Sequence, residues 1–172
     1  DKTDQTNTNL GVRKGELKFL RAFYYFLMVQ TYGGVAIVTE RTDKPILEFQ
    51  RNTAQEVYDF IATEMNDALA LVPEANDFGR VTKRAVKHFQ AKVALTRGYE
   101  TFGTQQDFTT AASLADAVID GQPLSTSFED LFYPGNEQDP EILFSVQYDA
   151  ASLLNGGFEG GNTQAYYFSC YM

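Results

Sequence analysis

GELKFLRAFYYFLMVQTYGG, residues 15–34, is the most strongly patterned segment of the chain. It predicts a helix over residues 15–32 that opens with a charged turn and ends before two glycines. Because apolar and aromatic residues surround this helix almost completely, we expect several neighbouring elements to bury it. Tyr24, Tyr25 and Tyr32 are accordingly interpreted as packing residues.

The composition is that of a folded globular protein. The 172 residues, of which 44% are hydrophobic, make one typical domain or a large piece of a bigger one. A net charge of -9 argues against nucleic acid and anionic membrane surfaces as ligands. The longest apolar run, residues 22–29, is far shorter than the ~20 residues that span a bilayer. Because the chain begins with Asp1 and has no signal peptide, we interpret it as a processed or excised piece.

A second helix is predicted from the sequence after Thr53. Thr53 and Glu56 have the spacing of a capping box, in which each side chain satisfies a free amide of the first turn. Apolar residues then recur at three- and four-residue spacing, and Pro73 ends the pattern. An extended run over residues 35–38 precedes this amphipathic helix.

Two further helices are expected to form an antiparallel hairpin. The pattern predicts helices over residues 82–102 and 108–119, the second ended by Gly121 and Pro123. Gly98, a turn at Gly103, an alanine cluster and a final proline follow the order of the tetratricopeptide repeat. The fold class is therefore mainly α, with tetratricopeptide-like antiparallel helix pairs.

The helical period stops after residue 123, which gives an expected division into a helical scaffold over 1–123 and an irregular segment over 124–172. The irregular segment contains a short helical turn over 128–132, a strand-like run over 142–148 and a glycine-rich loop over 149–172. Such a loop rarely folds alone. We therefore expect this segment to be an incomplete part of a larger domain.

Known catalytic motifs are absent from the sequence, so no enzyme activity, metal or cofactor is predicted. The carboxylate pairs Glu129/Asp130 and Asp139/Glu141 could act as acid and base, but surface or capping roles are favoured in so acidic a chain. The single Cys170 is interpreted as a buried apolar group and the basic run over 80–88, with its histidine, as a solvated helix start.

Aromatic residues supply the best candidates for ligand contact. Tyrosine combines a flat face with a hydroxyl, which suits stacking on sugar rings or on a partner's apolar surface. Tyr166 and Tyr167 lie near Asn162 and Gln164 in the glycine-rich loop. These four residues are the predicted ligand site, although packing is an alternative role for the tyrosines.

Several ordered blocks resemble the SusD/RagB family of outer-membrane nutrient-binding lipoproteins. The stretch over residues 15–26, taken together with the helix exit over 32–40, is similar to the family's hallmark block. The segments over 51–73, 79–98 and 141–148 agree with later family blocks in order. Ala36 departs from the pattern, since the family usually has proline there, so the exit from the first helix is expected to be less rigid.

The resemblance implies a tetratricopeptide-like scaffold with an irregular, ligand-bearing remainder and no catalysis. It also implies capture of oligosaccharide or another nutrient at the cell surface, as a lid on a SusC-like TonB-dependent transporter of the outer membrane. Membrane association would come from a lipid anchor absent from these residues, since family members are longer. A helical-repeat module for protein–protein interaction is the alternative.

Overall fold

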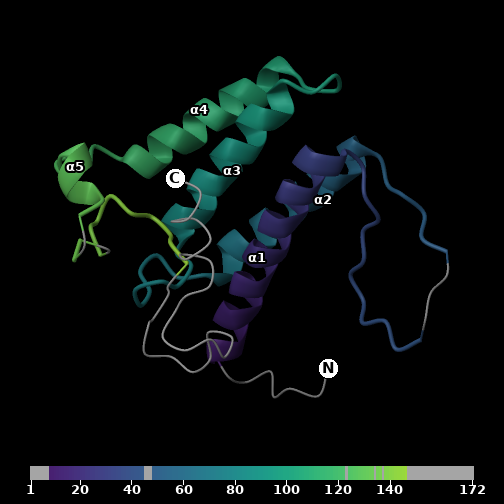
Figure 1. The fold of residues 1–172 in the computed structure, drawn as a ribbon, viewed down its shortest axis with the longest axis horizontal. Helices are drawn as coiled ribbons and strands as arrows, with labels where there is room; N and C mark the ends of the chain where they lie inside the picture. Colours follow the sequence, from purple (N-terminus) through teal and green to yellow (C-terminus); the bar gives the residue numbers. More distant parts are fainter. Residues whose placement is uncertain (1–7, 45–47, 123, 134, 137, 147–172) are drawn as a thin grey trace, which may run out of the picture.

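Helices connected by turns and loops make up the described part of the chain. The computed structural model describes residues 8–44, 48–122, 124–133, 135–136 and 138–146. Within these residues there is no strand, which confirms the mainly α fold (Figure 1). The helices are α1 (Thr8–Tyr32), α2 (Ala54–Leu71), α3 (Lys83–Gly98), α4 (Gln105–Ile119) and the single turn α5 (Phe128–Leu131).

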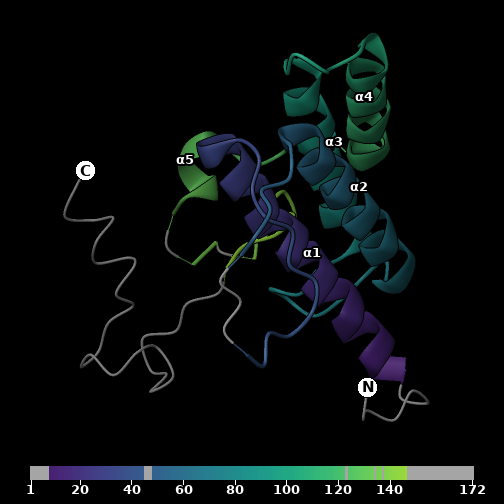
Figure 2. The ribbon, with the colours of Figure 1, turned by 90° about the vertical axis from the view of Figure 1, so that its right-hand side faces the viewer.

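The four long helices form two antiparallel hairpins. α1 packs on α2 and α3 packs on α4, while α2 and α3 provide the contact between the pairs (Figures 1 and 2). Phe89 of α3 adds a second link, because its ring lies 5.3–5.7 Å from the rings of three α1 phenylalanines, Phe19, Phe23 and Phe26. This arrangement confirms the predicted helix pairs.

α1 begins at Thr8, earlier than predicted, and only one of its faces is buried. The buried face repeats at three- and four-residue spacing and is formed by Phe19, Ala22, Phe26 and Val29. The opposite face, which we call the α1 apolar stripe, is 36–66% exposed and consists of Leu17, Leu20, Tyr24 and Leu27. The prediction that α1 is buried on all sides is thus wrong within the described residues, because α2 and Phe89 cover only one side of this helix.

The tyrosines of α1 differ in environment. Tyr25 is buried as predicted, and its hydroxyl accepts a hydrogen bond of 2.8 Å from the amide of Val38. Tyr24 and Tyr32 are 62% and 66% exposed within the described part, so the prediction that they pack in the core is wrong for them. Both lie outside the face that α2 covers.

The exit from α1 is held by residues that precede α2. Gly34 passes so close to Asn52 that a Cβ would lie 2.0 Å from its carbonyl oxygen. Arg51 donates to the carbonyl oxygens of Tyr32 and Gly34, and the Asn52 side chain accepts from the amide of Ile37 at 3.0 Å. Residues 35–38 belong to neither a helix nor a strand, so the extended run stays a prediction.

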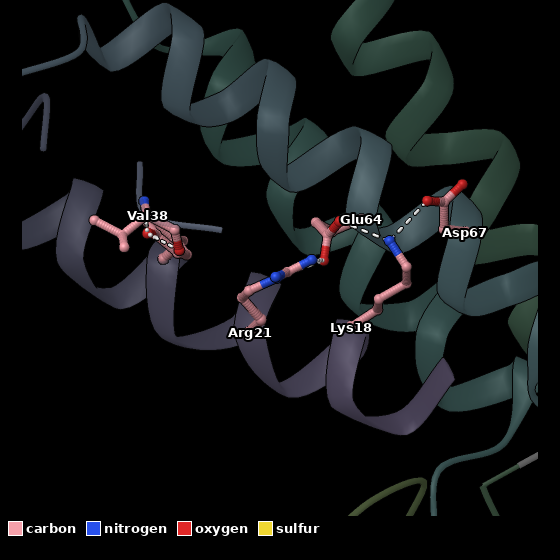
Figure 3. A network of polar contacts seen from close by, with 6 residues as sticks. Lys18, Arg21, Val38, Glu64 and Asp67 are labelled. Carbon is pink, nitrogen blue, oxygen red and sulfur yellow. Dashed lines mark hydrogen bonds and ion pairs between the residues drawn. The ribbon is translucent and has the colours of Figure 1, made fainter. Parts of the chain in front are cut away.

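α2 begins where the sequence predicts, with both hydrogen bonds of the Thr53 capping box present. The buried Glu64 carboxylate joins α2 to α1 (Figure 3). It accepts hydrogen bonds from Lys18 Nζ at 2.8 Å and from Arg21 Nε at 2.7 Å. Burial lowers the Lys18 pKa, but hydrogen bonds to Asp67 and Glu64 outweigh it and raise the pKa above its usual value. The ammonium group is thus charged throughout the neutral range.

The turn between α3 and α4 depends on close approach at glycine. A Cβ on Gly98 would lie 2.7 Å from the ring of Phe108, and one on Gly103 would lie 2.5 Å from the carbonyl oxygen of Arg97. α3 ends at Gly98 and α4 starts at Gln105, so the predicted limits at 102 and 108 are corrected. A capping box between Thr104 and Asp107 sets the earlier start of α4.

The segment after α4 returns to the helices. Phe144 packs edge-on against Phe19, with ring centroids 5.3 Å apart. Residues 142–146 form no strand, so the strand-like prediction is wrong over this range; residues 147 and 148 and the glycine-rich loop lie outside the described residues. The apolar run there packs on helices and pairs with no other strand in the described part of the chain.

Candidate functional site

The four predicted ligand residues, Tyr166, Tyr167, Asn162 and Gln164, lie outside the residues that the structure describes, as does Cys170. Their assignment stays a prediction. The described part nevertheless contains an exposed aromatic surface in the same irregular segment.

Three aromatic side chains gather at α5 and form what we call the α5 aromatic cluster. Phe128, Phe132 and Tyr133 are 82%, 71% and 65% exposed. The rings of Phe128 and Phe132 lie 5.0 Å apart at an interplanar angle of 59°. Because a single helical turn places residues four apart on one face, α5 brings these two rings together. Such exposed flat faces can stack on a sugar ring.

Local hydrogen bonds hold the α5 turn in place. The Ser127 hydroxyl accepts from the amide of Asp130 at 3.1 Å and donates to its carboxylate at 2.6 Å. Asn136 donates to the carbonyl oxygen of Asp130 at 2.6 Å. Ser127 is therefore the N-cap of α5, and the Asp130 carboxylate is bonded to the Ser127 hydroxyl.

A cavity of about 520 Å³ lies beside α5, between α3, α4 and the segment that returns from α5. Its size is within the range of small-ligand sites. Leu124 and Ser125, which immediately precede the α5 turn, form part of its wall. Polar groups of Arg84, His88, Gln122 and Glu141 line the rest together with apolar side chains such as Ile119 and Leu143. This mixture suits a ligand that presents both hydroxyls and apolar ring faces.

The second acidic pair is used to fix the same segment. The Glu141 carboxylate accepts from the amides of Ser125 and Thr126, and Asp139 accepts from the Thr126 hydroxyl at 2.8 Å. Both carboxylates are thus committed to loop structure. Within the described residues, no three potential metal ligands come together.

The basic run over residues 80–88 also has structural partners. Arg80 pairs with the buried Glu16, and Lys83 lies 3.0 Å from Glu74. Arg84 Nε donates to the carbonyl oxygen of Val118 at 2.9 Å. These contacts join the start of α3 to α1, to the preceding loop and to the end of α4.

The α5 aromatic cluster was missed as a ligand surface by the sequence analysis, which identified Phe128 and Phe132 only as a helical turn. The available signal is the four-residue spacing of two phenylalanines in a segment beyond the last long helix. Large apolar side chains at that spacing would normally face a core, but within the described ranges no long helix covers them.

Comparison with known protein families finds one family model that matches this chain. Residues 1–95 match the SusD-like family model described as starch-binding and associating with the outer membrane. In the part of the chain that the structure describes, no helix has the length and apolar character needed to cross a membrane. The match covers more than half of the chain, so it shows the family.

Relatives support the same family. A SusD-like protein of Bacteroides ovatus is 33% identical over 141 residues, covering 77% of this chain and 26% of that protein. The starch-binding protein SusD of Bacteroides thetaiotaomicron is 27% identical, covering 84% of this chain and 27% of that protein. The chain thus spans about a quarter of the length of these relatives.

A solved structure agrees with the fold. A crystal structure with xylogluco-oligosaccharide superposes with a TM-score of 0.76 at 30% identity, covering 85% of this chain and 31% of that one. Family model, relatives and fold converge, and the chain belongs to the SusD-like family of starch-binding, outer-membrane-associated proteins.

Proposed function

We propose that the protein containing this chain is a non-catalytic, cell-surface binder of oligosaccharide. The family match carries the proposal, because its members are described as starch-binding. Related structures include one with xylogluco-oligosaccharide and a laminarin-binding SusD-like protein that is 26% identical with a TM-score of 0.60. Three of the four acidic residues weighed as catalytic groups, Asp130, Asp139 and Glu141, accept hydrogen bonds from the α5 turn and its loop, which favours binding over hydrolysis.

The α5 aromatic cluster is the described surface that fits this role best. Phe128 and Phe132 offer adjacent apolar faces, and the neighbouring cavity offers hydroxyl, amide and charged groups for hydrogen bonds. Sugar recognition commonly combines such stacking with directed polar contacts. We propose that Tyr166 and Tyr167, with Asn162 and Gln164, contribute to the same site.

Calorimetric titration of the full-length protein with starch, laminarin and xyloglucan oligosaccharides tests the proposal. Phe132→Ala should weaken binding about tenfold, since base-to-aromatic stacking, the nearest measured analogue, contributes ~1–3 kcal/mol per ring. Phe49→Ala is the matched control, because this exposed phenylalanine belongs to the segment between α1 and α2. Figure 1 shows that segment on the opposite side of the ribbon from α5. Absence of binding to every glycan would reject the function.

We further propose that the full-length protein is lipid-anchored at the outer membrane and delivers its ligand to a SusC-like TonB-dependent transporter. The family's association with the outer membrane supports this placement. Detergent extraction of the native membrane, followed by affinity purification of the tagged full-length protein, should recover the transporter. If the transporter does not co-purify, delivery to it is rejected. Glycan binding is then still decided by the titration.

A further inference from the structure

The approach to α5 is held by a side chain that lies beyond the helix in the sequence. One carboxylate oxygen of Glu141, Oε1, accepts hydrogen bonds from two successive backbone amides, those of Ser125 and Thr126, the second at 2.8 Å. Hydrogen bonds to a carboxylate are stronger than those between neutral groups. Two such bonds to adjacent amides fix both the position and the orientation of this stretch of backbone.

Asp139 completes the same arrangement. Its Oδ2 accepts from the Thr126 hydroxyl at 2.8 Å, and its Oδ1 accepts from the amide of Glu141 at 2.8 Å. Asp139 thus holds the backbone of the residue whose side chain holds Thr126. We call Asp139 and Glu141, with the groups of residues 125 and 126 that they bind, the carboxylate clasp. The clasp joins segments that are 13–16 residues apart in the sequence.

The clasp connects α5 to the long helices. On one side, Thr126 is followed by Ser127, the N-cap of α5. On the other side, Glu141 is followed by an apolar run whose Phe144 packs on Phe19 of α1, with ring centroids 5.3 Å apart. The clasp therefore fixes the start of α5 relative to α1.

Packing alone does not hold α5 in place. None of its four residues is buried, and no extensive contact between α5 and a long helix is found among the described residues. A single helical turn is also far too short to be stable by itself. The position of α5 therefore depends on the clasp, and the exposed rings of Phe128 and Phe132 depend on it through α5.

We propose that Glu141 and Asp139 are positioning residues of the glycan site, which hold the α5 aromatic cluster in place before the ligand arrives. This inference rests on the proposed binding of glycan at α5. Rings that are already in place need no ordering when a sugar stacks on them, so less of the binding free energy is lost. Glu141 also lines the neighbouring cavity, whereas Asp139 and Thr126 do not. A change at Asp139 therefore tests positioning without altering a lining side chain.

Calorimetric titration of full-length variants with starch, laminarin and xyloglucan oligosaccharides tests the inference. Glu141→Ala and Asp139→Ala should each weaken glycan affinity about fivefold, the size expected when a segment must be ordered on binding. Glu141→Gln should bind as the wild type does, because its amide oxygen can accept both backbone bonds. Asp116→Ala, the matched control, removes an exposed carboxylate of α4 that does not line the cavity and should leave the affinity unchanged.

Hydrogen exchange of the ligand-free protein reports the position of α5 directly. In both alanine variants, the amides of Asp130 and Leu131, which bond to Ser127, should exchange faster than in the wild type. The melting temperature should change little, because no residue of the clasp belongs to the buried core.

Three results would overturn the inference. One is an Asp139→Ala variant with unchanged glycan affinity or unchanged exchange of α5. The second is an equal loss of affinity in Glu141→Gln and Glu141→Ala, which would show direct contact with the ligand. The third is a melting temperature that falls together with affinity, which would show a general role in folding. Absence of glycan binding by the wild type would instead reject the proposed function, while hydrogen exchange would still decide whether the clasp orders α5.

Discussion

At the scale of single residues, the most demanding position is Glu64. Its side chain is 5% exposed, yet its carboxylate has two cationic partners, Lys18 and Arg21, which are 17% and 33% exposed. A buried carboxylate is tolerated only when paired and hydrogen-bonded. Glu64 thus fixes the register of α2 on α1, while the apolar contacts around it provide most of the packing.

Glu64→Ala should destabilise the protein by roughly 2–3 kcal/mol, below the 3–5 kcal/mol range for fully buried pairs because both cations retain some water. The midpoint of urea unfolding measures the change. Glu74→Ala, at an exposed pair with Lys83, is the matched control and should cost less than about 1 kcal/mol. Equal effects of the two changes would contradict a special role for Glu64.

Tyr58 makes stability depend on alkaline pH. Burial, together with the negative charge of Glu100, raises the pKa of Tyr58 from 10.0 to about 12. Between these values the unfolded chain loses the proton while the folded protein keeps it, so stability is full below pH 10 and falls as the pH approaches 12. Between pH 10 and pH 12, the melting temperature of Tyr58→Phe should therefore fall less than that of the wild type. Parallel pH profiles would refute the assignment.

Tyr167 tests the ligand residues predicted from the sequence. Tyr167→Ala should reduce glycan affinity with little change in melting temperature if the ring contacts the ligand. A fall in stability of about 1.5–3 kcal/mol with unchanged affinity would instead show that the ring is buried in the core. Calorimetry and thermal unfolding of the same variant separate the two roles.

At the scale of elements, helix ends were predictable where a side chain caps them within a clear pattern. The box of Thr53 and Glu56 gave the start of α2 correctly. The start of α1 was missed because residues 8–14 lack apolar periodicity, and the start of α4 because its box uses Asp107 in place of glutamate. The small size of Gly98 indicated that another element packs closely there, but the sequence did not identify the Phe108 ring as that neighbour.

Gly98→Ala should destabilise the α3–α4 hairpin by about 1–3 kcal/mol, because the new methyl group would overlap the Phe108 ring. Gly11→Ala is the matched control in α1, where a Cβ meets nothing within 4 Å. That change should stabilise the protein by roughly 0.5–1 kcal/mol, since glycine is costly inside a helix. Thermal unfolding compares the pair, and a neutral Gly98→Ala would show that the hairpin can relax.

At the scale of the whole molecule, the sequence revealed the family and the helix pairs, but it did not reveal that the aromatic rings at α5 are exposed within the described part. A pocket lined by α2, α3 and α4 combines side chains of three helices, among them Gln90 and Arg97 of α3. Among the described residues, Gln90 Oε1 and Arg97 Nε are buried without a hydrogen-bond partner, which only the three-dimensional packing reveals. The exposure of the α1 apolar stripe also could not be read from the sequence, because it depends on which side of α1 the other described elements cover.

Phe89 has a consequence for how the molecule unfolds. Its ring is packed among three rings of α1, so it links the stability of one hairpin to that of the other. Phe89→Ala should therefore reduce folding cooperativity: in native-state hydrogen exchange, amides of α4 should open at a lower free energy than amides of α2. Phe49→Ala should leave both sets exchanging as in the wild type. One aromatic ring would then decide whether the two hairpins unfold together or one after the other.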